Sequence, residues 1–228
     1  MKPRCRHANT KKIKIFLILE CLFQNSFYLC PRNFHNMARS VEFNEAETIE
    51  KAMNVFWEKG YHGTSMQDLV EAMQINRSSL YNTIGDKHCL FLKCISTYAE
   101  AGMAEVKAKV ARETSALQAL INIIRDKAAW VVDCEKGCLG VKTIFEIAPE
   151  DAQVRNLLNK NNEMYLEFLT ELVQRAIDDG ELDRSEDAAI VAEYILTTFT
   201  GWKQAYILHR NPIAIRKMSE FLIKSITK

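Results

Sequence analysis

The sequence has 228 residues, of which 48% are hydrophobic and 26% are charged, a composition suited to a globular protein with a substantial core. Its 8 Gly and 4 Pro argue against a β-rich fold with many tight turns and favour long helices. The net charge of +1 excludes a generally basic coat for nucleic acid, because residues 37–228 hold 23 Lys and Arg against 28 Asp and Glu.

Residues 1–36 differ from the rest of the chain. They hold seven Lys and Arg against Glu20 alone, and Lys11 to Phe23 join a basic cluster to a short apolar run. Glu20 interrupts this run, no small-residue cleavage site follows it, and it is too short to span a bilayer. We interpret residues 1–36 as an extension or disordered tail, with Met37 as the biological start. A basic arm that lies along nucleic-acid phosphates is the alternative.

The seven cysteines lack the Cys-x-x-Cys spacing of a metal site. Four of them lie inside helical patterns, where a free thiol behaves as a small hydrophobic group: Cys89, Cys94, Cys134 and Cys138. We therefore expect no metal, no cofactor, no membrane insertion and a reducing, cytoplasmic location.

The first predicted element is a helix over about Asn44 to Lys59. Its apolar residues recur at the spacing of one helix face: Ile49, Ala52, Met53 and Phe56. Asn44 can cap the first turn, where Glu45 and Glu47 suit the helix dipole. Gly60 can end the helix.

A second short helix follows, with Thr64 or Ser65 as its cap. Its apolar face consists of Met66, Leu69, Val70 and Met73. Residues 74–76 form a tight break before the next helix. Two short helices joined by such a turn, with a preceding helix as support, indicate a helix-turn-helix over about residues 44–87.

The third helix runs from about Arg77 to Ile84, with Leu80 directed inward, and Gly85 and Asp86 end it. Its outward side chains form hydrogen bonds and none is acidic: Arg77, Ser78, Ser79, Asn82 and Thr83. Base edges and phosphates require such groups, whereas a solvated face usually includes Glu or Asp. A small polar surface helix is the alternative interpretation.

The stretch Phe56 to Phe91 resembles the N-terminal domain of the tetracycline-repressor (TetR) family. The matching positions stand in the family's order: Gly60-Tyr61, Thr64-Ser65, the aliphatic face of the second helix, Leu80-Tyr81 and Asp86-Lys87. The motif covers about 45 residues, and the helical remainder agrees in length and layout.

The resemblance implies a DNA-reading role for these helices. Thr64 and Ser65 would cap the second helix, whose amides would face a phosphate. Four residues would enter the major groove or its rim: Arg77, Ser78, Ser79 and Asn82. Tyr81 and Thr83 would hold the DNA backbone, and Lys87 would contact a phosphate.

Two positions depart from the family pattern. Gln74 stands where a turn glycine is usual, so a left-handed backbone at a cost of about 1 kcal/mol is expected there. Ile84 replaces an aromatic residue, which requires adjusted packing between the third and fourth helices. Neither change removes a group that would face DNA.

The rest of the chain reads as long helices. The predicted ranges are His88–Val110, Leu117–Val132, Cys138–Ile147, Glu150–Asp179, Ser185–His209 and Ile213–Ile226. The fold class is therefore all-α, with a three-helix helix-turn-helix DNA-binding domain at residues 37–87 and a helical ligand-binding and dimerisation domain at residues 88–228.

Apolar stripes on the last two helices comprise Val191, Ile195, Phe199, Trp202 and Tyr206 on one and Met218, Phe221, Leu222 and Ser225 on the other. Such stripes are most often core. The resemblance implies that these helices pair between subunits, and two half-sites also bind far more tightly than one. We expect a homodimer.

The resemblance also implies a pocket for a small-molecule inducer of unknown identity. The candidate lining is Trp130, Cys134, Cys138, Phe145, Tyr165, Phe168, Phe199 and Trp202. Solid core packing is the alternative for each. Cys134 and Cys138 flank Gly137 near Lys136, so a thiol switch for oxidants or electrophiles is a further hypothesis beside plain packing.

These patterns predict a DNA-binding transcriptional regulator. The resemblance implies that it is a repressor released by a ligand, with a double-stranded palindromic operator as partner. An enzyme is not expected, because the sequence has no Gly-rich phosphate loop, His-Glu-x-x-His or Gly-x-Ser-x-Gly motif. The alternatives are a helical interaction protein without DNA binding and a thiol-based redox or electrophile sensor of the same regulatory type.

Overall fold

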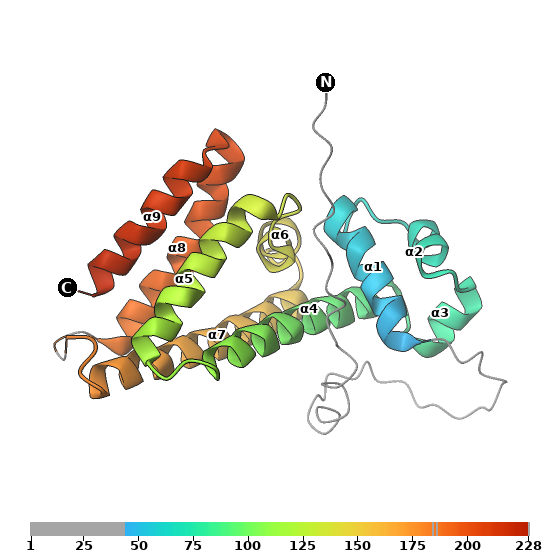
Figure 1. The fold of residues 1–228 in the computed structure, drawn as a ribbon. Coiled ribbons are helices and arrows are strands. Elements are labelled where there is room, and N and C mark those ends of the chain that lie inside the picture. The colour runs from blue at the N-terminus through green and yellow to red at the C-terminus, as the bar shows by residue number, and fades with distance from the viewer. Residues whose placement is uncertain (1–43, 184, 186, 228) are drawn as a thin grey trace. The chain divides into compact units, whose positions relative to one another are not determined.

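The computed structural model describes residues 44–183, 185 and 187–227, and the secondary-structure elements in these ranges are the helices α1 to α9 (Figure 1). The leader at residues 1–36 lies outside the described residues. No helix in the described part combines the length and the apolar character that a membrane crossing requires.

Three short helices form the reading head: α1 (Glu45–Lys59), α2 (Met66–Met73) and α3 (Arg77–Thr83). Each begins at a side-chain cap, because its first amides have no partner within the helix. Asn44 accepts a hydrogen bond from the amide of Glu47, and Asn76 accepts one from the amide of Ser79. The cap at Asn44 was predicted, whereas Asn76 was predicted only as part of a turn.

The core of the reading head continues beyond α3. Leu69 and Leu80 are fully buried, as predicted. They belong to a cluster that also contains Leu90 of α4 (Lys87–Val110), together with Leu139 and Val154. A domain boundary at residue 87 therefore coincides with the start of a helix, but the apolar core continues across it.

The remaining helices are α5 (Ala116–Asp133), α6 (Leu139–Glu146), α7 (Ala152–Asp178), α8 (Ala188–His209) and α9 (Pro212–Ile226). The starts of α7 and α8 fall two and three residues after the predicted ones, because Asp151 and Asp187 accept hydrogen bonds from the first-turn amides. Pro212 occupies the first turn of α9, where a missing amide proton is tolerated.

The two apolar stripes that were predicted on the last two helices differ in burial. On α8, Val191, Ile195, Phe199 and Trp202 are buried. On α9, Met218 and Phe221 are 39% and 69% exposed, and Ser225 is exposed as well. The buried face of α9 consists instead of Ile215, Ser219, Leu222, Ile223 and Ile226, which pack where α9 meets α5 and α8. The predicted α9 stripe was thus wrong as a core face, apart from Leu222.

Candidate nucleic-acid interface

The outward face of α3 is polar and accessible. Arg77, Ser78, Asn82 and Thr83 are exposed, and Ser79 is half-buried. Leu80 lies on the opposite side and is fully buried, which fixes the rotation of the helix. Tyr81 is 46% exposed, a large share for an aromatic ring on a helix of seven residues. The geometry therefore presents hydroxyl, amide and guanidinium groups together.

The turn between α2 and α3 has the predicted left-handed residue. Gln74 has φ 57° and ψ 35°, and its amide donates to the carbonyl of Glu71. Asn76 then caps α3. Ile84, which was expected to adjust the packing with α4, is partly buried against the core of the reading head.

The N-terminus of α2 carries a reciprocal cap. Ser65 accepts from the amide of Asp68, and the Asp68 carboxylate accepts from the amide of Ser65. Lys59 of α1 donates to the same carboxylate at 2.5 Å. The Lys59 ammonium, followed by Ser65, holds the pKa of Asp68 well below its usual range.

Thr64 requires a correction. It was expected beside Ser65 among the DNA-facing residues, but its side chain is 2% exposed and its hydroxyl donates to the carbonyl of Gly60 at 2.5 Å. It closes the turn between α1 and α2, while Ser65 alone caps α2 and remains exposed.

Lys87 lies in the first turn of α4, which Asp86 caps by accepting from the amide of Cys89. Its Nζ is 4.3 Å from the centre of the Tyr61 ring. Burial lowers the pKa of Lys87. The aromatic contact directs the ammonium along one edge of the reading head.

A segment outside the reading head, residues 134–146, forms hydrogen bonds with the end of α1 and the turn that follows it. The indole Nε1 of Trp57 donates to the carbonyl of Gly137 at 2.9 Å, and Lys142 Nζ donates to the carbonyl of Trp57 at 2.9 Å. The amide of His62 donates to Glu146 at 2.9 Å. These contacts were not predicted. Their partners are 80 or more residues apart, and no local pattern pairs them.

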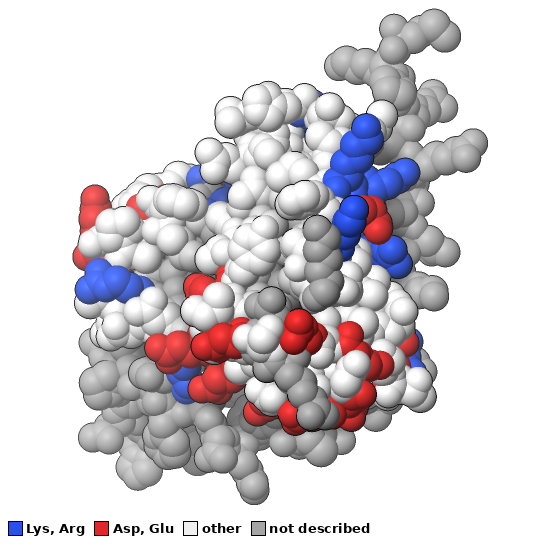
Figure 2. Space-filling model, turned by 90° about the vertical axis from the view of Figure 1, so that its left-hand side faces the viewer, with Lys and Arg blue, Asp and Glu red and all other residues white. Residues whose placement is uncertain are grey.

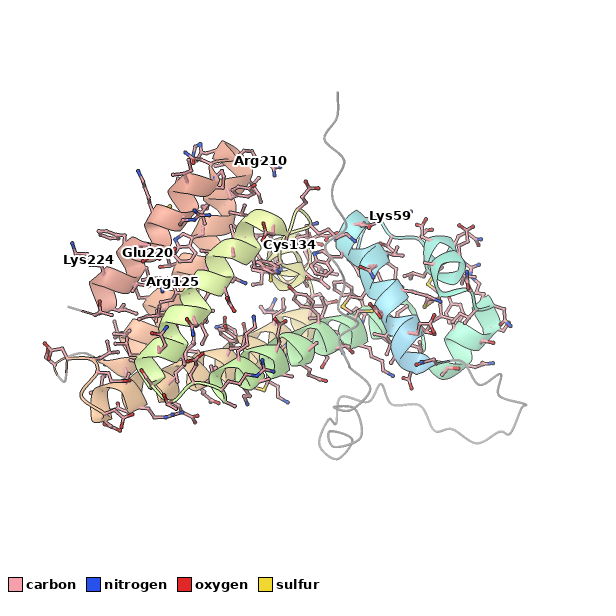
Figure 3. The ribbon with its side chains drawn as sticks, in the orientation of Figure 1. Lys59, Arg125, Cys134, Arg210, Glu220 and Lys224 are labelled. Atoms are coloured by element: carbon pink, nitrogen blue, oxygen red, sulfur yellow. The ribbon has the colours of Figure 1, made fainter. Side chains whose placement is uncertain are left out.

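Five of the proposed pocket residues gather in one apolar cluster. Phe199 and Trp202 are buried, and three others pack partly buried against them: Trp130, Tyr165 and Phe168. Burial raises the pKa of Tyr165 to about 12. Cys134 lies where α5 ends beside α6 (Figure 3).

Phe145 does not belong with this group. Its side chain is 74% exposed on α6, because the face of this short helix that packs inward is formed by Leu139 and Thr143. Trp202 also borders a surface hollow between α8 and α9, together with Tyr194, Met218 and Phe221. The other predicted pocket residues do not border that hollow.

A short turn joins α2 to α3, the exposed face of α3 has no acidic side chain, and α1 supports both helices. These features define a helix-turn-helix DNA-binding protein. Matches to known protein families agree with this class. Residues 49–94 match the domain of bacterial regulatory proteins of the tetR family, and residues 114–222 match a tetracyclin repressor-like C-terminal domain.

The chain belongs to the TetR family. It is 32% identical to the uncharacterised HTH-type transcriptional regulator YezE of Bacillus subtilis (strain 168), over 70% of this chain and 84% of that one. It is 24% identical to the HTH-type transcriptional repressor ComR of Escherichia coli (strain K12), over 70% of this chain and 77% of that one.

Among solved structures, a cysteine mutant of the TetR family regulator CifR, complexed with 26-base-pair operator DNA, is similar to this chain. The TM-score is 0.72 at 26% identity, covering 82% of this chain and 98% of the other. The protein is therefore a DNA-binding transcriptional regulator and not an enzyme, and the alternative of a helical protein without DNA binding is set aside.

Proposed function

We propose that the protein is a repressor that binds a palindromic operator as a homodimer and leaves it when a small molecule binds the body. The observation on which this rests is the accessible, acid-free face of α3, fixed by the buried Leu80. Polar and cationic side chains on a short helix with an apolar underside are suited to the major groove.

Each DNA-facing residue has a proposed role. Arg77, Ser78, Ser79 and Asn82 contact base edges or the groove rim. Tyr81 and Thr83 hold the DNA backbone, and Lys87 contacts a phosphate. Ser65, which caps α2, brings the N-terminus of this helix to a phosphate. Thr64 supports this end only through its bond to Gly60.

Selection of genomic DNA fragments by the purified full chain tests the proposal. Recovered fragments should share a two-fold symmetric site, and the logarithm of the binding constant should fall linearly with the logarithm of salt concentration. Recovery of unrelated sequences with equal affinity would contradict operator recognition.

An exposed apolar surface on α8 and α9 supports the homodimer. Of the eleven exposed large hydrophobic side chains among the described residues, seven lie on these two helices: Ile190, Tyr194, Ile207, Leu208, Ile213, Met218 and Phe221. On the side that includes α9, Figure 2 shows a broad area without charge above a band of acidic side chains. We name these seven residues the α8–α9 face. A second copy would remove it from water.

The segment at residues 134–146 supports a route for release. It contacts Trp57 of α1 and His62 in the turn after α1, and it begins beside the aromatic cluster that contains Trp130. A ligand that shifts this segment would therefore rotate the reading heads of a dimer and misalign them with their half-sites. A free-energy difference of about 1–3 kcal/mol between the two states is sufficient.

Repression, rather than activation, is supported by the similarity to the repressor ComR. A reporter placed downstream of the selected site in the native cytoplasm distinguishes the two. Deletion of the gene should raise reporter expression. A fall in expression would identify an activator.

A further inference from the structure

A cluster of ionisable side chains lies where α5 ends, apart from the DNA-binding face. Tyr98 comes from α4, Lys127 from α5, Cys134 and Cys138 from the residues joining α5 to α6, and Lys203 from α8. The Nζ atoms of Lys127 and Lys203 lie 4.1 and 5.9 Å from the centre of the same Trp130 ring, and Lys203 also donates to the carbonyl of Cys134. The cluster therefore joins two cations, two thiols and a phenol.

Of the two lysines, Lys203 is buried and Lys127 is half-buried. Lys203 is 6% exposed, and its Nζ donates to the carbonyls of Val131 and Cys134 at 3.1 and 2.6 Å. Lys127 Nζ lies 4.1 Å from the centre of the Trp130 ring. Burial lowers the pKa of both lysines, and the nearby thiols oppose that shift. In the part of the chain that the structure describes, neither ammonium forms an ion pair with a carboxylate.

The two thiols have opposite hydrogen-bonding roles. The Tyr98 hydroxyl donates to Cys138 Sγ at 3.6 Å, whereas Cys134 Sγ donates to the carbonyl of Gly137 at 3.7 Å. Both sulfur-bearing residues are partly exposed, while Cys94 is fully buried and burial raises its pKa to about 12. Cys138 thus combines access, a hydrogen-bond donor and nearby cations, which are the features of a reactive cysteine.

We propose that Cys138 is a covalent modification site for soft electrophiles of the α,β-unsaturated carbonyl or quinone class. The sulfur electron pair of the Cys138 thiolate forms a bond to the β-carbon. Water accepts the proton of the Cys138 thiol before the attack. The π electrons of the carbon–carbon double bond then form the double bond of an enolate, and the carbonyl π pair moves to its oxygen, which the Tyr98 hydroxyl is placed to stabilise. Water finally returns a proton to the α-carbon. No oxidant is required.

The adduct would disturb the hold on α1. Gly137 precedes Cys138 and accepts the hydrogen bond of the Trp57 indole, and the Trp57 ring meets the Tyr98 ring edge-on at 5.2 Å. A group attached to Cys138 is next to Tyr98 and Gly137, and its bulk would strain the contacts that these two residues make with Trp57. This regulatory consequence rests on the proposed function, whereas the modification itself does not.

Mass spectrometry of the full chain treated with limiting N-ethylmaleimide tests the modification without DNA. For each cysteine, the rate of modification in the folded chain is divided by its rate in the urea-unfolded chain. Cys138 should react about tenfold faster in the folded state, and Cys94 should be protected. Tyr98→Phe should reduce the Cys138 ratio several-fold. A Cys138 ratio below one would overturn the proposal, whatever the DNA-binding result.

Gel shifts with a selected operator test the consequence. N-ethylmaleimide should release DNA from the chain without substitutions and from the Cys134→Ser variant, but not from the Cys138→Ser variant. Serine is suited to position 138, because Cys138 is the N-cap of α6 and makes no side-chain cap bond. Release that persists in Cys138→Ser, or rapid Cys138 modification without release, would overturn the link to DNA binding.

Discussion

Two exposed surfaces of this protein have opposite chemistry. The outward face of α3 consists of hydroxyl, amide and guanidinium groups, whereas the α8–α9 face consists of aliphatic and aromatic groups. In the proposed function, the first meets the hydrogen-bonding edges of a DNA groove and the second meets a second copy of the chain. Two solvent-exposed helix surfaces can therefore be suited to different partners, and the difference lies in the side chains rather than in the helix geometry.

The largest expected effect follows from a charge placed on the α8–α9 face. Phe221→Asp adds a carboxylate at a position that is 69% exposed in one subunit and covered in the proposed dimer. Sedimentation should show a monomer, and operator affinity should fall about a hundredfold or more because the two half-sites are no longer linked. Met164→Asp, on the exposed side of α7, is the matched control. A Phe221→Asp dimer of normal affinity would remove the distinction between the two surfaces.

Changes on α3, and at Lys87 in the first turn of α4, should weaken DNA binding without changing assembly. Asn82→Ala should cost about 1–3 kcal/mol against the preferred site and alter base preference. Tyr81→Ala and Lys87→Ala should weaken binding to all sequences alike. Gel-shift titrations measure both effects, with the exposed Asn162→Ala of α7 as control. Normal affinity in all three variants would show that α3 does not read DNA.

A smaller effect is expected at the turn that presents α3. Gln74→Gly should raise the free energy of unfolding by about 1 kcal/mol, because glycine adopts the left-handed conformation without steric cost. Gln67→Gly, inside α2, should lower it by about the same amount. Denaturant titrations give both values. A loss of stability in Gln74→Gly would mean that the glutamine side chain supports the turn.

The smallest effect concerns acid sensitivity of the reading head. Lys59 and Ser65 lower the pKa of Asp68, and the amide of Cys89 lowers that of Asp86. The unfolded chain therefore binds more protons in acid, so this stabilisation is present above about pH 4 and is lost as the pH falls below it. In Asp68→Asn, thermal unfolding should depend less on pH between about 5 and 3. An unchanged dependence would exclude Asp68 as a contributor.

Much of the reading head could be predicted because its determinants are local. The cap at Asn44 and the buried Leu80 each follow from neighbouring residues in the chain, whereas the left-handed Gln74 was expected from the resemblance to the TetR family. The same local logic failed for Thr64, since a hydroxyl next to a helix start can cap the helix or turn back to a carbonyl. The choice depends on how α1 ends at Gly60.

The sequence by itself determined a helical chain with a short polar helix after a tight turn, because helix periodicity, caps and turn residues act within a few positions. Only the tertiary structure decided which side of α9 is buried, how Trp57 meets Gly137, and that Tyr98 contacts Cys138 while Lys203 contacts the carbonyl of Cys134. Those relations join residues separated by dozens of positions, and packing between helices, rather than the order of residues along one of them, brings them together.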